Sequence, residues 1–173
     1  MPMLFATLGY PGSGKTYFCQ RLAEKLNIFH LNTDRMHIEI FPNPKFTHEE
    51  QITKFRVMNY VAEELLKRKA SVIFDADSAE WRYRKELKAM AERNGADYLL
   101  LWFKTPLEVA LKRVKSRKGQ DERYYRVISQ DVVLGHKVAE EIPDPKNENF
   151  VIIDGTKSFE EQYKILEDYL SGS

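Results

Sequence analysis

The sequence predicts an α/β fold in which a parallel β-sheet is covered by helices on both faces. Short apolar runs with the length of buried strands recur along the chain, at residues 3–8, 28–31, 71–75, 98–103 and 150–154. The longer segments between them carry apolar residues every three or four positions, as helices with one buried side do. Strands that alternate with helices favour a parallel sheet, because each helix returns the chain to the edge where strands begin.

The composition fits a single domain, residues 1–173, with an ordinary hydrophobic core. Hydrophobic residues make up 43% of the chain and charged residues 31%, values typical of a soluble globular protein. The formal net charge is +1, so no strong field favours nucleic acid or a membrane surface as a partner. The single cysteine, Cys19, excludes an internal disulfide and is expected in the core. We therefore expect a cytoplasmic protein without a membrane span or a secretion signal.

A glycine-rich octapeptide, GYPGSGKT, runs from Gly9 to Thr16 and matches the phosphate-binding P-loop pattern. Glycines let successive backbone N–H groups turn toward one anion, and the helix that follows directs its positive dipole end to the same place. Lys15 is expected to reach the β- and γ-phosphates, and Thr16 to offer its hydroxyl to Mg²⁺. The candidate nucleotide-binding residues are Gly9, Tyr10, Pro11, Gly12, Ser13, Gly14, Lys15, Thr16 and Tyr17.

An aspartate, Asp34, follows the second predicted strand and precedes a short helix that reaches Ile40. Ligands of open α/β sheets bind outside the carboxyl ends of the strands, so Asp34 is expected where chemistry takes place. The alternative is that Asn32, Thr33 or Asp34 only caps the short helix. The two roles compete for the same carboxylate.

Two more aspartates follow the third predicted strand. Asp75 ends that strand in the Walker B form, whose carboxylate orients Mg²⁺, usually through water. Asp77 lies two residues further and would share a face with Asp75 in extended backbone, so the pair could hold a metal. Alternatively, one of them caps the helix expected over residues 78–93. Arg82 and Arg84 on that helix face either the cleft or the solvent.

The long helix expected over residues 48–69 begins after a proline-containing loop at residues 41–45. Thr47 and Glu50 have the spacing of a capping box, with a threonine N-cap and a glutamate three residues on. Arg56 and Tyr60 lie four residues apart on one side of this helix. Arg56 is a candidate substrate contact, and a solvated helix face is the alternative.

Positive charge is dense after the fourth predicted strand. Basic residues occur at Lys112, Arg113, Lys115, Arg117, Lys118, Arg123 and Arg126, with Gly119 among them. A solvated helix end would account for such a run. It also suits a mobile lid that lays arginines on a transferring phosphoryl group, and Arg113 and Arg117 are the candidates for that role.

The P-loop, Asp34, Asp75 and the basic segment together resemble the P-loop kinases related to polynucleotide kinase and zeta toxin, of which gluconate and chloramphenicol kinases are similar relatives. The resemblance covers nearly the whole chain. It implies a three-layer α/β/α fold with a five-stranded parallel sheet in the order 2-3-1-4-5 and a lid. It also implies that Asp34 is the catalytic base, and that Gly155 and Thr156 lie near the adenine.

Two positions depart from that family's pattern. Relatives commonly carry arginine three residues beyond the catalytic aspartate, where this chain has His37. They tend to have threonine or asparagine two residues after the strand-three aspartate, where this chain has Asp77. Both changes reduce positive or neutral character where an anionic acceptor phosphate would sit, which weakens the case for a polynucleotide acceptor.

The resemblance also suggests how the chain divides around the site. The expected core comprises residues 1–35, 70–112 and 148–170. A substrate-side helical region would occupy residues 36–69, and the lid with its following helix residues 113–140. The substrate-binding candidates are Asp34, His37, Arg56, Asp77 and Arg82.

Three functions fit these features. The first is an ATP-dependent kinase that phosphorylates a hydroxyl group of a small molecule, with Lys15, Asp34, Arg113 and Arg117 as catalytic residues and Mg²⁺ on Thr16 and Asp75. The second is a polynucleotide 5′-hydroxyl kinase, which would need a basic groove. The third is a non-catalytic or ATPase-type nucleotide-binding module. The sequence lacks the N-K-x-D motif of GTPases, and Ala76 stands where AAA+ ATPases usually carry glutamate. The acceptor and the oligomeric state are not determined by the sequence.

Overall fold

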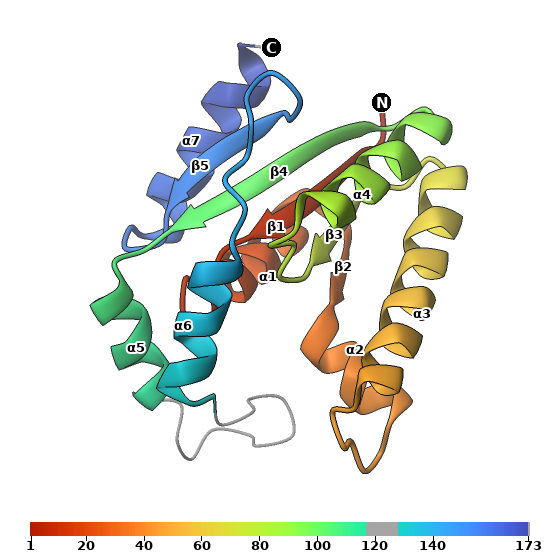
Figure 1. The fold of residues 1–173 in the computed structure, drawn as a ribbon. Helices are drawn as coiled ribbons and strands as arrows, with labels where there is room; N and C mark the ends of the chain where they lie inside the picture. Colours follow the sequence, from red (N-terminus) through yellow and green to blue (C-terminus); the bar gives the residue numbers. More distant parts are fainter. Residues whose placement is uncertain (117–127, 173) are drawn as a thin grey trace.

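Five parallel strands form one sheet in the order β2-β3-β1-β4-β5, as predicted. The computed structural model describes residues 1–116 and 128–172 (Figure 1). The strands are β1 (Met3–Leu8), β2 (Phe29–Asn32), β3 (Val72–Asp75), β4 (Asp97–Lys104) and β5 (Phe150–Asp154). Within the described residues the helices are α1 (Lys15–Leu26), α2 (Thr33–Ile40), α3 (His48–Lys67), α4 (Trp81–Arg93), α5 (Leu107–Ser116), α6 (Gln130–Ala139) and α7 (Phe159–Ser171).

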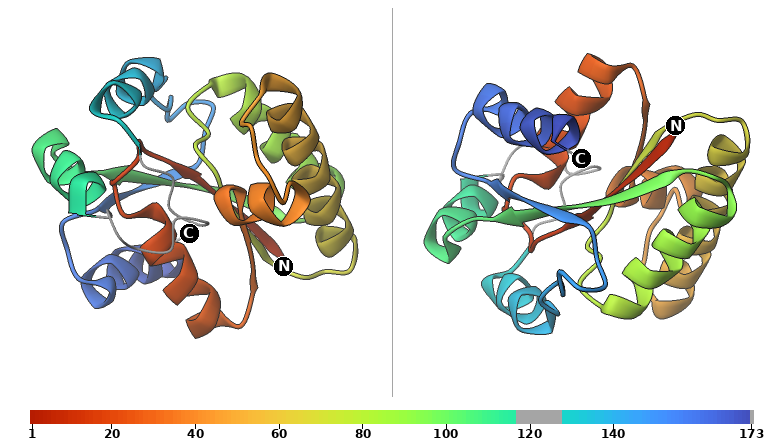
Figure 2. Two further views of the ribbon diagram at one scale, coloured as in Figure 1. Left: turned by 90° about the horizontal axis from the view of Figure 1, so that it is seen from below. Right: turned by 90° about the horizontal axis from the view of Figure 1, so that it is seen from above.

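The central strand β1 shows why the sheet is covered on both faces. Leu4 and Leu8 point to one face and pack into a core with residues of α3 and α4. Phe5, between them in sequence, points to the other face and packs with residues of α1 and α7. Successive side chains of a strand alternate between faces, so an apolar run is buried only when both faces are covered. Figure 2 shows these two helical layers on opposite sides of the sheet.

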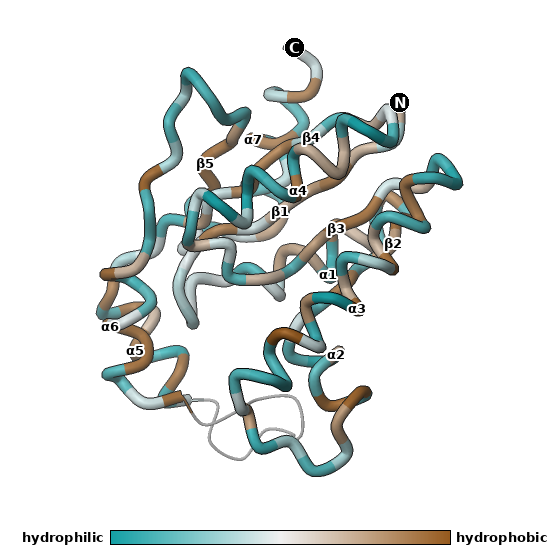
Figure 3. The backbone as a smooth tube through the Cα atoms, turned by 45° about the vertical axis from the view of Figure 1, so that its right-hand side comes forward, coloured by the Kyte–Doolittle hydropathy of each residue, from teal (hydrophilic) through white to brown (hydrophobic). Residues whose placement is uncertain are grey.

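The hydropathy of the chain follows these layers. In Figure 3 the tube is largely brown along the inner strands, whereas the surrounding helices are banded in teal and brown. The banding reflects helices with one buried side, such as α3, whose buried positions Lys54, Met58, Ala62 and Leu66 recur every four residues. No helix in the described part of the chain has the length and apolar character that crossing a membrane requires.

The helix expected over residues 78–93 begins three residues later, at Trp81. The backbone before it crosses the end of the sheet, where the Ser78 N–H donates to the Thr7 carbonyl at 3.3 Å. Arg84, on the first turn of α4, is 1% exposed and donates from Nη1 to the Ser78 and Ala79 carbonyls at 2.9 and 2.7 Å. Its Nε donates to both carboxylate oxygens of buried Glu148. Arg84 therefore neither faces the cleft nor lies on the surface; it fixes the β3–α4 connection.

The strand order brings the polar strand ends to one edge. Asn32, the last residue of β2, is the register partner of Asp75, the last residue of β3. The P-loop follows β1, which is the neighbour of β3 in the sheet. The predicted phosphate loop and both predicted acidic strand ends therefore meet at the carboxyl edge, as an open α/β sheet requires.

Candidate active site

A cavity of about 990 Å³ opens at the carboxyl edge of the sheet. Its lining comes from the P-loop, the ends of β2 and β3, α2, the loop before α3, the first turns of α3, the first turn of α4, and α6 with the residues before it. Of the predicted site residues, the structure places the following in this lining: Pro11, Gly12, Ser13, Gly14, Lys15, Thr16, Asp34, His37, Asp75 and Asp77. Residues that were expected to bind a nucleotide and residues that were expected to bind a substrate thus share one cavity.

The backbone of the P-loop has a conformation and a close packing at Gly12 that suit only glycine. Gly12 has φ of 87°, and a Cβ atom there would stand 2.5 Å from the Ala110 carbonyl oxygen of α5. A side chain at this position would therefore meet both backbone strain and a collision. Lys15 bends back over the loop, and its Nζ donates to the Gly9 carbonyl and, at 3.3 Å, to the Tyr10 carbonyl.

Tyr10 belongs to the loop but not to the cavity lining. Its ring is buried with Ala110, Val114 and Val133, which come from α5 and α6, and its hydroxyl donates to the Thr105 carbonyl. Tyr10 therefore anchors the loop with its side chain, and its backbone carbonyl faces Lys15. Gly9 likewise offers a carbonyl to Lys15 and does not line the cavity.

Gly155 lies against the P-loop, and Thr156 is exposed beside it. A Cβ at Gly155 would stand 2.0 Å from Thr105 Oγ1 and 2.2 Å from the Ser13 carbonyl oxygen, so only glycine fits there. The Thr156 hydroxyl and N–H both donate to Asp154. The place of this turn next to the loop agrees with the predicted adenine side of the site. Contact with adenine stays a prediction for Gly155 and Thr156, and nucleotide binding stays a prediction for the exposed Tyr17.

Asp75 is the most constrained carboxylate of the site. It is 2% exposed, its Oδ2 accepts from Asn32 Nδ2 at 2.6 Å, and the same oxygen lies 3.0 Å from His30 Nε2. Burial alone would raise the pKa of Asp75, but the hydrogen bonds with His30 and Asn32 and the charge of Lys15 outweigh it and lower the pKa. Asp75 is therefore ionised at neutral pH.

Asn32 links the two predicted metal residues. Its Nδ2 reaches Thr16 Oγ1 at 3.4 Å as well as Asp75, so one amide bridges the P-loop helix and the end of β3. Oxygen donors from a carboxylate and a hydroxyl at one place fit Mg²⁺. Sequence reasoning considered Asn32 only as a helix cap and missed this bridge, which depends on the pairing of β2 with β3.

The same Asn32 decides the competition over Asp34. The Asn32 Oδ1 accepts from the Arg35 N–H at 2.9 Å and so caps α2. Asp34 lies one residue inside the helix, is exposed, and lines the cavity. The cap is therefore Asn32, and Asp34 lines the same cavity as Lys15 and Thr16.

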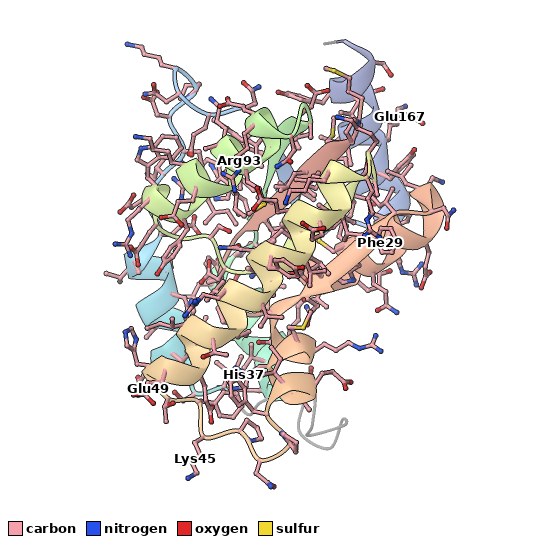
Figure 4. All side chains as sticks on the ribbon, turned by 90° about the vertical axis from the view of Figure 1, so that its right-hand side faces the viewer. Phe29, His37, Lys45, Glu49, Arg93 and Glu167 are labelled. Carbon is pink, nitrogen blue, oxygen red and sulfur yellow. The ribbon has the colours of Figure 1, made fainter. Side chains whose placement is uncertain are left out.

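His37 lies at the border of the cavity and is almost fully buried. Its Nε2 is 3.0 Å from Glu50 Oε2, and its ring stacks on Phe46 with centroids 4.6 Å apart. Figure 4 labels His37 where α2 meets the loop of Lys45 and the start of α3. Glu50 also accepts from the backbone N–H groups of Lys45 and Phe46.

This arrangement corrects the predicted capping box. Thr47 caps α3 by accepting from the Glu50 N–H at 3.2 Å, as expected. The Glu50 carboxylate, however, turns to His37 and to the preceding loop, not back to the Thr47 N–H. His37 consequently holds α2 against α3. A direct contact between His37 and a substrate stays a prediction.

Asp77 pairs with His136 of α6. The His136 Nδ1 contacts the Asp77 Oδ2, and both residues line the cavity. Neither Asp75 nor Asp77 caps α4, whose N-cap residue is Glu80. The proposed capping role of these aspartates was therefore wrong. The pair instead connects the end of β3 with the helix that follows the predicted lid.

The predicted arginines separate into three groups. Arg113 lies at the P-loop, where its Nη1 donates to the Gly12 carbonyl at 3.3 Å. Arg56 and Arg82 are exposed and do not line the cavity, and Arg82 lies over the neighbouring Tyr83 ring at 5.1 Å. Arg117, and most of the predicted lid with it, lies outside the described residues.

One buried cation of the cavity was missed. Lys54 on α3 is 6% exposed, lines the cavity, and donates to Gln51 Oε1 at 2.6 Å. A signal existed in the sequence, because Lys54 heads the four-residue repeat of Met58, Ala62 and Leu66. Because the helical spacing was read from apolar residues, the charged Lys54 was not assigned to the buried side of this helix. Lys54 supplies a positive charge to the cavity, where His37 and Asp77 had been expected to reduce the positive character.

Three potential metal ligands also meet below the cavity. Cys19, His30 and Asp75 each bring one ligand atom within 4.8 Å of the others. Burial raises the pKa of the Cys19 thiol well above its usual value, so the thiol stays protonated. Cys19 is fully buried among the apolar residues that cover this face of the sheet, so it packs here as a core residue next to Asp75.

A family model, AAA_33, described as an AAA domain, matches residues 4–142 of the chain. The chain belongs to the AAA_33 family. The match spans every described residue that lines the cavity. The resemblance to P-loop kinases is thereby confirmed.

Relatives with kinase names support the same group. The chain is 31% identical over 150 residues to an L-seryl-tRNA(Sec) kinase of Methanococcus maripaludis, and the match covers 82% of this chain and 57% of that protein. It is 30% identical over 144 residues to an adenylate kinase of Mycobacterium leprae, covering 76% of each. The chain thus spans little more than half the length of the first relative.

Among solved structures, a sugar kinase of Janibacter sp. HTCC2649 superimposes with a TM-score of 0.74 at 17% identity, covering 99% of this chain and 95% of that one. At such identity the likeness shows the fold. Together, the family, the relatives and the fold assign this chain to the P-loop kinase group, and they leave its acceptor open.

Proposed function

We propose that this protein is an ATP-dependent kinase that transfers the γ-phosphoryl group of ATP to a hydroxyl group of a small-molecule acceptor. One observation carries the proposal: the phosphate loop and Asp34, which come from different elements, line the same cavity, and the cap of α2 is Asn32 and not Asp34. A carboxylate opposite a P-loop is placed to receive a proton during phosphoryl transfer.

The residues divide the reaction between them. Lys15 and the backbone N–H groups of the loop hold the β- and γ-phosphate oxygens. Thr16 and Asp75, joined by Asn32, are the residues that would hold Mg²⁺, which when bound neutralises charge on the phosphate oxygens. Arg113 extends positive charge to the loop from α5, and Arg117 is proposed to do so from the lid.

Asp34 accepts the proton that the acceptor hydroxyl releases in the transfer step. The acceptor hydroxyl donates a hydrogen bond to the Asp34 carboxylate and gives up its proton there as its oxygen bonds to the γ-phosphorus. The bond from the γ-phosphorus to the β–γ bridging oxygen breaks, and ADP leaves with that electron pair. The products are ADP and a phosphate monoester, and the proton passes from Asp34 to solvent.

The test replaces the proposed base without changing its shape. In Asp34→Asn, turnover with a hydroxyl acceptor is expected to fall by roughly 10²- to 10⁴-fold, the usual contribution of a positioned general base. ATP binding, measured by calorimetry, is expected to stay unchanged because Asp34 does not belong to the loop. Acceptors are found by screening sugars, nucleosides, antibiotics, hydroxy acids and 5′-hydroxyl oligonucleotides for ADP release and identifying the product by mass spectrometry. Near-normal turnover of Asp34→Asn would remove Asp34 as base.

An acceptor attached to RNA is the second candidate. The relative from Methanococcus maripaludis is named for a seryl group on a tRNA, which makes a hydroxyl on or near a nucleic acid a specific alternative. Binding that requires phosphate contacts falls steeply with salt. An oligonucleotide or tRNA acceptor whose phosphorylation weakens with rising salt would replace the small molecule. ATP hydrolysis without any phosphorylated acceptor would support the third candidate, an ATPase-type module.

A further inference from the structure

The proposal starts from Lys54, a charged residue on the buried side of α3. The other three positions of that stripe, Met58, Ala62 and Leu66, are apolar and pack in the core. Lys54 is 6% exposed and so nearly as buried as they are, but it stands at the end of the stripe where α3 reaches the cavity. Burying a lysine costs free energy unless its charge has a partner, so the position calls for a reason.

Within the described residues, Lys54 has no hydrogen-bonded carboxylate: burial lowers the pKa of its ammonium group, and the charge of Asp34 offsets only part of that lowering. Its Nζ donates to the neutral Gln51 side chain at 2.6 Å and lies 4.9 Å from the centre of the Phe55 ring. None of the ion pairs found among the described residues, with N···O distances up to 4.0 Å, involves Lys54. An ammonium group carries three N–H donors, so Lys54 keeps donors for a ligand in the cavity.

A second buried cation, Arg84, shows what a purely structural charge looks like in this protein. Arg84 is held by Glu148 and by two backbone carbonyls and does not line the cavity. Both cations are buried, but among the described residues Arg84 is hydrogen-bonded to a carboxylate, whereas the hydrogen-bond partner of Lys54 is the neutral Gln51. This difference points to a ligand as the partner of Lys54.

The residues around Lys54 indicate which chemical groups that ligand has. Asp34 acts electrostatically on Lys54 and lines the same cavity, so an acceptor hydroxyl at Asp34 has Lys54 as its neighbour. The rings of Phe55 and Tyr83 stack with their centroids 6.0 Å apart. They form an apolar wall of the cavity that Asp34 and Lys54 also line. One positive charge close to the negative Asp34 suits a monoanionic carboxylate better than a dianionic phosphate.

We propose that Lys54 is the anion-binding residue of the acceptor site and that the physiological acceptor is a hydroxy acid, a molecule with a carboxylate for Lys54 and a hydroxyl for Asp34. The inference rests on the proposed kinase function and names its substrate class. Lys54 is thereby a specificity-determining residue that acts on acceptor binding. Lys54 does not take part in ATP binding, which is the role of the P-loop.

The experiment compares hydroxy acids with polyols of the same carbon chain. D-glycerate is paired with glycerol, and D-gluconate with D-glucitol, and each is measured for binding by calorimetry and for phosphorylation by ADP release. The wild-type protein is expected to bind and phosphorylate at least one acid roughly 10- to 100-fold better than its polyol, the gain of a hydrogen bond to a charged group. Glycerol 3-phosphate is the phosphate arm, and a preference for it over D-glycerate contradicts the carboxylate assignment.

The variant Lys54→Met removes the charge and keeps a long side chain that suits the neighbouring Met58. It is expected to fold, because it buries no charge, and to lose the preference for the acid while its affinity for ATP is unchanged. Lys54→Arg is expected to retain part of the preference. The control is Lys67→Met, on the same helix, whose side chain is exposed and pairs with Glu64; it is expected to behave as the wild type.

Two different failures are distinguishable. If polyols and acids bind or react equally in the wild type, or if Lys54→Met keeps the preference, the hydroxy-acid inference is wrong and the kinase function stands. If the acids bind through Lys54 but no hydroxyl compound is ever phosphorylated, the subsite is supported and the proposed kinase function is wrong. If neither acid binds more tightly than its polyol, the subsite is refuted whatever the enzymatic result.

Discussion

On the donor side of the cavity, the buried Asp75 is held by His30 and Asn32, and Asn32 reaches on to Thr16. On the acceptor side, the buried Lys54 has the neutral Gln51 as its hydrogen-bond partner among the described residues. Among the described residues, the Asp75 carboxylate of the proposed donor side thus has its hydrogen-bond partners, whereas the Lys54 ammonium group of the proposed acceptor side keeps donors for a ligand. Substitutions on the donor side should impair the reaction with every acceptor, and those on the acceptor side should discriminate between acceptors.

The largest expected effect is that of Lys15→Ala on the donor side. The change removes the cation that is proposed to reach the phosphates, and turnover should fall by roughly 10³-fold or more, as with other lost electrostatic contacts in phosphoryl transfer. The loss should be equal for acids and polyols, which a comparison of initial rates measures. Lys25→Ala, a surface change on α1, is the matched control. Unequal losses would mean that Lys15 also contacts the acceptor.

The second test is Asn32→Ala, which removes the bridge between Thr16 and Asp75. Residues that orient metal ligands typically contribute 10- to 100-fold in metal affinity, so the Mg²⁺ concentration for half-maximal rate should rise by about that factor. The lost N-cap of α2 should also cost about 1 kcal/mol of stability, measured by urea unfolding. Asn43→Ala, in an exposed loop, provides the control. An unchanged Mg²⁺ requirement would separate Asn32 from the metal site.

A smaller effect is expected from Tyr83→Ala on the acceptor side. The change removes one ring of the stacked pair with Phe55, and an aromatic pair contributes about 0.5–1.5 kcal/mol, or roughly a 2- to 12-fold rise in KM for the acceptor. The KM for ATP should not change. Tyr60→Ala on α3, 67% exposed and outside the cavity lining, is the comparison variant. A rise in KM for ATP instead would put Tyr83 on the donor side.

The smallest effect concerns the acid sensitivity of the acceptor side. Burial alone would raise the pKa of Glu50, but the N–H groups of Lys45 and Phe46 and the contact with His37 lower it below its usual 4.5. Stability from Glu50 is therefore present above about pH 4.5 and is lost as the pH falls through the lowered pKa. Melting curves should show this loss in the wild type and a shallower one in Glu50→Gln. Parallel curves for the two proteins would show that Glu50 does not contribute.

Several features could be predicted from the sequence because they depend on neighbouring residues. The P-loop needs glycines, Lys15 and Thr16 within eight positions, and the strands need only short apolar runs. The family resemblance then supplied the strand order. Helix ends were less certain, as at α4, where the Arg84 contacts hold the backbone before Trp81 out of the helix.

The identity of this protein as a P-loop kinase, its phosphate loop and its candidate base Asp34 were thus determined by the sequence. The tertiary structure alone decided that Asn32 caps α2 and bridges to Asp75, 43 positions away, and that Asp77 is paired with His136, 59 positions away. It also decided that Lys54 faces the cavity. The physical reason is that a side chain's hydrogen bonds and charges are settled by the groups that folding brings next to it, and distant segments meet only when the sheet is assembled.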